Sequence, residues 1–129
     1  MIVVDSSVWI ANLRNSDSGA VQKLRSLSNP REIIVGDIVL LEVLQGGRDE
    51  RHAAAIEQHL RQFEIRSMLG ENIAVQAARN HRTLRELGVT IRKTADLIIG
   101  TFCMAGGHAL LHEDRDFDAM AQWLGLSVA

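Results

Sequence analysis

The sequence predicts an α/β fold built around a mostly parallel β-sheet. Short runs of β-branched and aliphatic residues, such as Ile2–Val4 and Ala109–Leu111, have the length and composition of buried strands. Longer segments with apolar residues at helical spacing separate these runs, and strands that alternate with helices form parallel sheets. No linker, repeat or low-complexity stretch interrupts the 129 residues. We therefore expect a single domain that covers residues 1–129.

The breaks in the first half of the chain each have a residue that explains them. Ser6 follows the first strand and can cap the first helix. Asn29-Pro30 separates the second helix from the second strand, and Gly46-Gly47 ends the third helix. In chain order, the predicted elements are a strand at 2–4, helices at 8–14 and 17–27, a strand at 32–35 and a helix at 37–46.

The second half of the chain contains the longer helices. Ile56, Leu60 and Phe63 recur at helical spacing in a segment that is otherwise polar. Gly88 stands just after the following helix, in the usual C-terminal position for glycine. In chain order, the predicted elements are a helix at 49–63, a short strand at 65–66, helices at 71–87 and 94–106, a strand at 109–111, a helix at 116–124 and an edge strand at 126–128.

The composition limits the class of protein. A formal net charge of −2 gives no general attraction for nucleic acid, so a nucleic-acid substrate would need a local basic rim or a bound metal ion. The single cysteine, Cys103, cannot form an internal disulfide and is typical of a reducing compartment. The N-terminus lacks the pattern of a signal peptide, and no apolar run approaches the roughly 20 residues that span a membrane. We therefore expect a soluble cytoplasmic protein.

Acidic residues follow two of the predicted strands directly. Asp5 comes after the first strand, and Asp114 and Asp116 follow the strand at 109–111 in the motif EDRDF. Ligands of open parallel sheets bind beyond the carboxyl ends of the strands, so these acids are well placed for chemistry. A single aspartate at such a place is also a common helix cap. Asp116 is the better cap for the last helix, which leaves Asp114 as the acid expected to face the crevice.

Two further acids lie in helices that are apolar on almost every side. Glu42 lies within DIVLLEVL, and Asp96 lies within TADLIIGTFCMAGG. Burying a lone carboxylate costs several kcal/mol unless positive charge compensates for it. Each acid also has a structural explanation, because Glu42 could lie on a narrow solvent-facing stripe with Gln45, and Asp96 gains from the dipole of its helix.

The joint pattern of these acids predicts a metal site. Carboxylates that converge at one edge of a sheet repel one another, and a hard cation with oxygen ligands offsets that repulsion best. Mg²⁺ or Mn²⁺ suits such a site better than Zn²⁺, which prefers nitrogen and sulfur. Divalent ions held in this way hydrolyse phosphodiesters by activating water. The nearest basic residues could contact substrate phosphates, and they are Arg92, Lys93 and Arg115.

Four parts of the sequence, in their order and at their separations, resemble the PIN-domain family. They are MIVVDSSVWI, the segment around Glu42, RKTADLIIGTFC and LLHEDRDFDAM, and within the family they look most like the VapC-type toxins of bacterial toxin–antitoxin pairs. The resemblance covers essentially the whole chain. It implies a three-layer α/β/α fold and a Mg²⁺- or Mn²⁺-dependent endoribonuclease. It also implies a homodimer that is inhibited by a small cognate antitoxin, whose C-terminal segment wraps the active-site groove.

The resemblance assigns roles by position. Asp5, Glu42 and Asp96 match the three central acids of the family, and Ser6 matches the small hydroxyl residue that supports the site. The fourth metal-site acid falls in EDRDF. There the resemblance favours Asp114, with Asp116 nearby as a helper, although the sequence leaves the division of labour between them open.

Other readings stay open from the sequence. A phosphotransferase with Asp5 as its nucleophile usually carries a second acid two residues later, where this chain has Ser7. A non-catalytic binding module would use the acids only as caps and surface charges. His112 lies close to the acidic motif but is better explained as a strand-end residue than as a catalytic base. Apolar residues of the first helix could form the antitoxin surface, the dimer surface or the core, and they include Trp9, Ile10 and Leu13.

Overall fold

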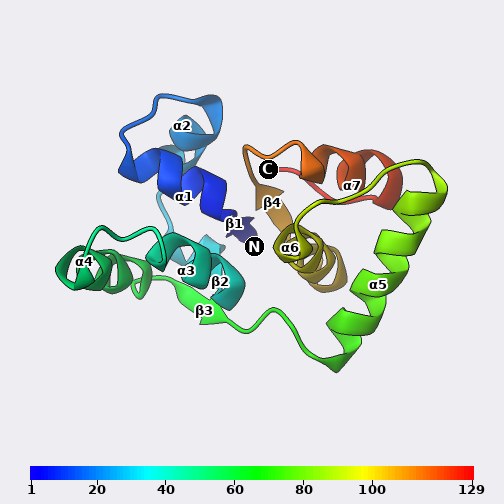
Figure 1. The fold of residues 1–129 in the computed structure, drawn as a ribbon. Coiled ribbons are helices and arrows are strands. Elements are labelled where there is room, and N and C mark those ends of the chain that lie inside the picture. The colour runs from blue at the N-terminus through cyan, green and yellow to red at the C-terminus, as the bar shows by residue number, and fades with distance from the viewer.

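A four-stranded parallel sheet in the order β3-β2-β1-β4 forms the centre of the computed structural model, which describes residues 1–129 (Figure 1). In the register, Ile2 lies opposite both Ile33 and Ala109, so β1 is central and pairs with β2 and β4. Because all strands run in one direction, their carboxyl ends open at one edge of the sheet. The strands are β1 (Ile2–Val4), β2 (Ile33–Gly36), β3 (Glu64–Arg66) and β4 (Ala109–Leu111).

Seven α-helices flank the sheet and complete the predicted α/β/α architecture, which the structure confirms. Figure 1 shows α1 to α4 on one side of the molecule and α5 to α7 on the other. None of the helices has both the length and the apolar character needed to cross a membrane. The helices are α1 (Ser6–Leu13), α2 (Gly19–Ser26), α3 (Asp37–Leu44), α4 (Glu50–Leu60), α5 (Glu71–Glu86), α6 (Thr94–Gly106) and α7 (Asp116–Leu124), and a short 3₁₀ turn covers Pro30–Glu32.

The apolar residues of the strands and of α6 belong to one core cluster of 26 buried residues, to which the other helices also contribute. Helix α6 is buried along most of its length, which explains why its sequence is apolar on almost every face. Trp9 is also part of this core, with only 3% of its surface exposed, and its ring lies 5.3 Å from that of Phe63. Of the alternatives left open for the first helix, Trp9 therefore belongs to the core, whereas Leu13 is 44% exposed.

The predicted edge strand at 126–128 is also wrong. The C-terminal segment makes a single bridge, between Leu110 and Val128, instead of a strand. Gly125 ends α7 with a φ of 82°, a left-handed conformation that glycine adopts without strain. The chain then turns Leu126 into the core, where it is 4% exposed, and this packing leaves too few extended residues for a regular strand.

Candidate functional site

Acids from separate parts of the chain meet beyond the carboxyl ends of β1 and β4. Asp5 follows β1, Asp96 lies in the first turn of α6, and Asp114 and Asp116 follow β4. One carboxylate oxygen each of Asp96, Asp114 and Asp116 lies within 4.8 Å of the others. Glu42 comes from α3, and the charges of Asp5 and Asp114 contribute to its electrostatic environment. The structure therefore brings all five predicted acids to one region, while their roles as metal ligands stay a prediction.

Asp5 is both a helix cap and a member of the acid cluster. Its Oδ2 accepts hydrogen bonds from the Ser7 backbone N–H at 3.0 Å and from the Ser7 hydroxyl at 2.5 Å, which begins α1. Its Oδ1 is buried and has no hydrogen-bond partner. Burial raises the pKa of the Asp5 carboxyl, although the hydrogen bonds from Ser7 oppose that rise. The capping role of Asp5 is thus confirmed through one oxygen, while the role of the other oxygen in the chemistry stays a prediction.

Asp96 is the most strongly perturbed acid of the cluster. Its residue is 3% exposed and its Oδ2 has no hydrogen-bond partner. Burial, followed by the negative charges of Asp114 and Asp5, raises the pKa of Asp96 to about 7. The dipole at the start of α6 favours an anion there, but burial and the neighbouring acids outweigh it. This position therefore favours a proton or another cation at neutral pH.

Glu42 is held from the other side of the site by a serine. Its residue is half-buried, and its Oε1 accepts a hydrogen bond of 3.1 Å from the hydroxyl of Ser6, which is itself 8% exposed. Burial raises the pKa of Glu42, while the hydrogen bond from Ser6 acts in the opposite direction. Glu42 therefore faces the first turn of α1 instead of a polar stripe in open solvent.

The loop around Asp114 holds its carboxylate in an ionised state. Asp114 Oδ1 accepts a hydrogen bond of 3.0 Å from the Asp116 N–H, and Oδ2 lies 3.6 Å from Lys93 Nζ. Although burial alone would raise the pKa of Asp114, the Asp116 N–H and Lys93 lower it overall. The ionised Asp114 lies beside an Asp96 that resists ionisation, and the pair therefore shares its negative charge unequally.

The expectation that Asp116 caps the last helix is wrong. Helix α7 begins at Asp116, and the carboxylate that accepts its first N–H belongs to Asp114, two residues earlier. The sequence could not distinguish these roles, because both aspartates lie close enough to the start of the helix to accept a hydrogen bond from its first N–H groups. The side chain of Asp116 instead lies with those of Asp96 and Asp114 in the acid cluster.

The basic residues predicted to bind substrate lie at the rim of this site. Lys93 and Arg92 come from the residues before α6, and Arg115 comes from the loop before α7. The negative charges of Asp114 and then Asp96 raise the pKa of Lys93, so its ammonium group remains charged. These three basic residues line a cavity of about 270 Å³ together with Glu113, Asp114 and Asp116.

Two functional contacts were missed from the sequence. The Ser7 hydroxyl, besides its bond to Asp5, accepts a hydrogen bond of 3.1 Å from the N–H of Glu113, and so joins α1 to the loop after β4. His112 Nδ1 accepts a hydrogen bond of 3.2 Å from the Asp114 N–H. The signal for Ser7 was the pair of hydroxyls directly after a strand-end acid. His112 gave no signal beyond its place at the end of a strand.

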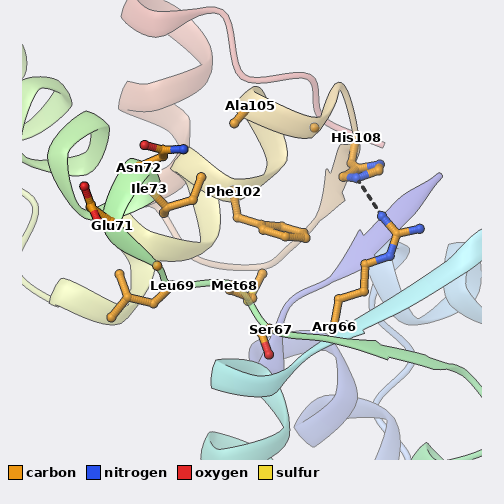
Figure 2. Close-up of a pocket in the computed structure, with 12 residues that line it drawn as sticks. Arg66, Ser67, Met68, Leu69, Glu71, Asn72, Ile73, Phe102, Ala105 and His108 are labelled. Carbon is orange, nitrogen blue, oxygen red and sulfur yellow. Dashed lines mark hydrogen bonds between the residues drawn. The ribbon is translucent and has the colours of Figure 1, made fainter.

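The largest cavity of the molecule lies at the other end of α6 (Figure 2). It measures about 650 Å³, and Phe102, Met68 and Ile73 are among its lining residues. His108 stacks on Phe102 with ring centroids 5.7 Å apart, and Arg66 Nη1 lies 3.5 Å from His108 Nε2. Arg66 is also paired with Glu64 at 2.8 Å. This cavity has space but no acid cluster, so it is not the candidate site.

Comparison with known proteins agrees with the sequence and the geometry. The chain is 26% identical over 131 residues to VapC ribonuclease Mb1587 of Mycobacterium bovis and to ribonuclease VapC11 of Mycobacterium tuberculosis, with 100% of this chain and 98% of each relative covered. Its fold is similar to VapBC2 from Rickettsia felis bound to a promoter DNA fragment, with a TM-score of 0.79, 16% identity and 100% and 98% of the two chains covered.

The fold is likewise similar to FitAcB from Neisseria gonorrhoeae, with a TM-score of 0.77, 20% identity and 99% and 96% of the two chains covered. The model of the PIN domain family matches residues 2–122 of the sequence. The resemblance inferred from the four sequence segments is therefore confirmed, and this chain belongs to the PIN-domain family.

Proposed function

We propose that this protein is a divalent-metal-dependent endoribonuclease that acts as the toxin of a toxin–antitoxin pair. The observation that carries this proposal is the acid cluster, in which Asp5 Oδ1 and Asp96 Oδ2 are buried without a hydrogen-bond partner. Such oxygens are costly unless a cation meets them. The PIN-domain match and the relatives named VapC ribonucleases support hydrolysis of RNA as the reaction.

The donor set fits Mg²⁺ or Mn²⁺. Every candidate ligand is a carboxylate, and these hard cations take oxygen ligands. The 4.8 Å limit on the oxygens of Asp96, Asp114 and Asp116 is close to the width of an octahedral Mg²⁺ shell, about 4.2 Å across. When bound, such an ion lowers the pKa of water and offsets the charge that develops on the phosphate. We assign the metal to Asp5, Glu42, Asp96 and Asp114, with Asp116 assisting.

The remaining residues of the site orient ligands and bind substrate. Ser6 and Ser7 hold the carboxylates of Glu42 and Asp5 by hydrogen bonds. These side chains therefore lose less conformational entropy when a cation binds. Lys93 keeps its positive charge beside the acids and would meet a phosphate oxygen of the RNA. Arg92 and Arg115 at the same rim would bind the neighbouring phosphates.

For the antitoxin, we propose the groove between α1, α3 and α4. Its cavity measures about 360 Å³, and it combines an apolar floor with a basic edge. An amphipathic helix with acidic residues beside its apolar face would suit such a groove. The fold likeness to VapBC2 and to a toxin–antitoxin complex from Klebsiella pneumoniae supports an antitoxin as a partner. The lining residues are Ile10, Leu13, Arg14, Val43, Gly46, Arg48, His52 and Ile56.

We also propose that two copies of the chain associate, and that the protein works in the cytoplasm. Large apolar side chains are exposed on α3, on α5 and on the loop between β3 and α5. Their exposed fractions are 58% for Leu41, 53% for Val75 and 50% for Leu69, so they offer contact area for a second copy.

The test of the nuclease is cleavage of total cellular RNA by the purified, antitoxin-free protein. Mg²⁺ or Mn²⁺ should yield discrete fragments, and EDTA should abolish them. Asp96→Asn should also abolish cleavage, while Glu32→Gln, which removes one exposed acid from the 3₁₀ turn, should not. A folded wild type that leaves RNA intact with either ion would overturn the proposal, and a phosphoryl group found on Asp5 would identify a phosphotransferase instead.

A separate assay tests the antitoxin groove. Leu13→Asp places a charge at the exposed edge of the apolar floor and should weaken antitoxin binding by at least about tenfold. RNA cleavage by the free protein should stay unchanged, because Leu13 is not among the acids or the basic rim. Unaltered antitoxin affinity, measured by calorimetry, would show that the partner binds elsewhere.

A further inference from the structure

The segment between Glu71 and Asp96 has a charge balance unlike that of the whole chain. It carries five of the chain's 14 lysines and arginines and only one of its 16 acids, although the chain has a net charge of −2. Solvated helices usually mix acids and bases, because opposite charges at i and i+4 stabilise each other. Helix α5 has no acid between Glu71 and Glu86. This imbalance points to an anionic partner.

Three of these basic residues form a row on α5. The arginine row consists of Arg79, Arg82 and Arg85, which follow one another at three-residue spacing and are all exposed. They span about 9 Å along the helix axis. The buried residues of the helix, Ala77, Asn80 and Leu84, lie on its other side. None of the three arginines takes part in an ion pair of the structure.

The arginine row is connected to the candidate site through a rigid arrangement. The Asn80 side chain donates a buried hydrogen bond of 3.0 Å to the Thr101 hydroxyl, which fixes α5 against α6. After α5 the chain runs back to the start of α6, as Figure 1 shows, and there Arg92 and Lys93 line the cavity beside Asp114. Two groups of positive charge therefore lie on either side of the segment that joins α5 to α6, namely the arginine row on α5 and the pair Arg92 and Lys93 at the edge of the acid cluster.

We propose that the arginine row binds the phosphate backbone of substrate RNA away from the bond that is cleaved. This inference rests on the nuclease proposed above. Guanidinium groups present paired donors that match phosphate oxygens, and unpaired arginines at this spacing can follow successive phosphates of one strand. The acid cluster repels an RNA backbone, so a separate basic surface would retain a long substrate while the scissile phosphate enters the site.

The composition of the row favours RNA over an acidic protein segment. Protein interfaces are anchored by large apolar or aromatic side chains in their centre. Between Arg79 and Arg85, the exposed residue other than Arg82 is Thr83, which is small and polar. The exposed apolar residues Val75 and Leu87 lie beyond the two ends of the row, and within it the exposed side chains are mainly charged. Charge alone is sufficient to bind a phosphate backbone without sequence preference.

The test compares two triple variants that remove the same charge. Both are made in the Asp96→Asn background, so that binding of a long mixed-sequence single-stranded RNA can be followed by fluorescence anisotropy without cleavage. The first variant is Arg79→Gln, Arg82→Gln, Arg85→Gln, and the control is Arg31→Gln, Arg51→Gln, Arg61→Gln. The control residues belong to the 3₁₀ turn and to the α4 region, on the other side of the molecule from α5 (Figure 1).

The α5 triple variant should weaken binding at least about tenfold at low salt and reduce the slope of log K against log salt by about 2. The control should change neither quantity by a comparable amount, since the Arg61–Glu57 pair it breaks is exposed. The same α5 positions changed to lysine should recover most of the slope, because the charge is restored. On the active protein, the glutamine variant should raise KM for long RNA but not for a short RNA that reaches only the acid cluster.

Equal losses in the α5 triple variant and in the control would overturn the arginine row while leaving the nuclease intact. Unchanged RNA binding in the α5 variant would do the same. If the wild type neither binds nor cleaves RNA, the nuclease proposal fails and the row fails with it. Thermal unfolding of each variant shows whether a loss arises from unfolding.

Discussion

The two ends of α6 differ in a way that locates the chemistry. Its first turn buries Asp96 beside other acids, with carboxylate oxygens that have no partner. Its last turns border a cavity of about 650 Å³ in which Arg66 is paired with Glu64 and His108 stacks on Phe102. The end with more space contains the ion pair of Arg66 with Glu64, whereas the end with less space gathers several carboxylates whose charges repel one another.

This difference teaches that unpaired charge is a better guide to function here than cavity size. A fold keeps buried carboxylates near one another only at a cost in stability. A protein tolerates this loss of stability where binding of a ligand, here the proposed cation, offsets it. An open cavity with paired charges carries no such cost and so gives no comparable sign of use.

The largest expected effect comes from removing the charge at the acid end. Asp96→Asn should lower the rate of RNA cleavage by at least about 100-fold, since a metal ligand matters at least as much as the groups that orient it. Phe102→Leu at the other end of the same helix should leave the rate unchanged. Initial rates of fragment formation in Mg²⁺ measure both variants. Similar losses in the two would end the distinction between the two ends.

A second comparison concerns the hydroxyls that support each end. Ser6→Ala removes the hydrogen bond to Glu42 and should weaken Mg²⁺ affinity by about tenfold or more. Ser67→Ala, which alters a serine of the large cavity, should leave Mg²⁺ affinity unchanged. Calorimetric titration with Mg²⁺ distinguishes the two variants. A Ser6→Ala protein that binds Mg²⁺ normally would exclude Glu42 from the proposed ligand set.

In metal-free protein, the groups at the two ends of α6 should make the free energy of unfolding depend on pH in opposite directions. Asp96 has a pKa of about 7 in the fold against 3.8 ordinarily, so the folded state binds up to about one more proton between these values. The free energy of unfolding should therefore fall as pH rises from about 4 to 7. Asp96→Asn should remove this part of the slope, as urea unfolding in EDTA can measure.

At the cavity end, burial first, and then the N-terminal amine and Arg66, lowers the pKa of His108 below its ordinary 6.5. The unfolded state then binds more protons, so stability is lost as pH falls below about 6.5. His108→Gln should remove this loss of stability below about pH 6.5. It should leave unchanged the fall in the free energy of unfolding with pH that is due to Asp96. A slope in the neutral range that is the same in the wild type and in Asp96→Asn would contradict the assignment.

The smallest effect is expected at the exposed rim. Lys93 lies 3.6 Å from Asp114 and is 64% exposed, so solvent screens its interactions. Lys93→Gln should weaken RNA binding a few-fold and reduce the salt slope by about 0.7, the contribution of one phosphate contact. Arg66→Gln, on the large cavity, should change neither. Equal effects of the two would mean that net charge, instead of position, controls RNA binding.

The sequence was sufficient for those features that depend on local composition. The bounds of α6 were predicted as observed, because an apolar run ends at Gly107, whose φ of 68° suits glycine. The strand-end positions of Asp5 and Asp114 followed from the apolar runs before them. The predicted edge strand failed because the packing of Leu126 into the core decides the path of the C-terminal segment, and local composition does not record it.

Features that depend on contacts between distant residues were not predictable in this way. The bond from Ser6 to Glu42 crosses 36 residues, and the bond from the Glu113 N–H to Ser7 crosses 106. The capping bond that Asp114, and not Asp116, accepts at the start of α7 depends on where that helix begins. Composition identified the acids, whereas only the fold supplies the groups that hold them.

The division of labour within Asp5 has a consequence for how this sequence can diverge. One oxygen accepts the hydrogen bond that begins α1, and the other is buried without a hydrogen-bond partner. A gene copy released from selection for cleavage would still be selected for a helix start, so position 5 should drift to asparagine or serine, which also cap helices. Position 96 has no capping bond to conserve and should accept a wider range of small residues. In gene copies that have lost the activity, we therefore expect Asp96 to be replaced by a residue of another kind before the polar residue at position 5 is lost.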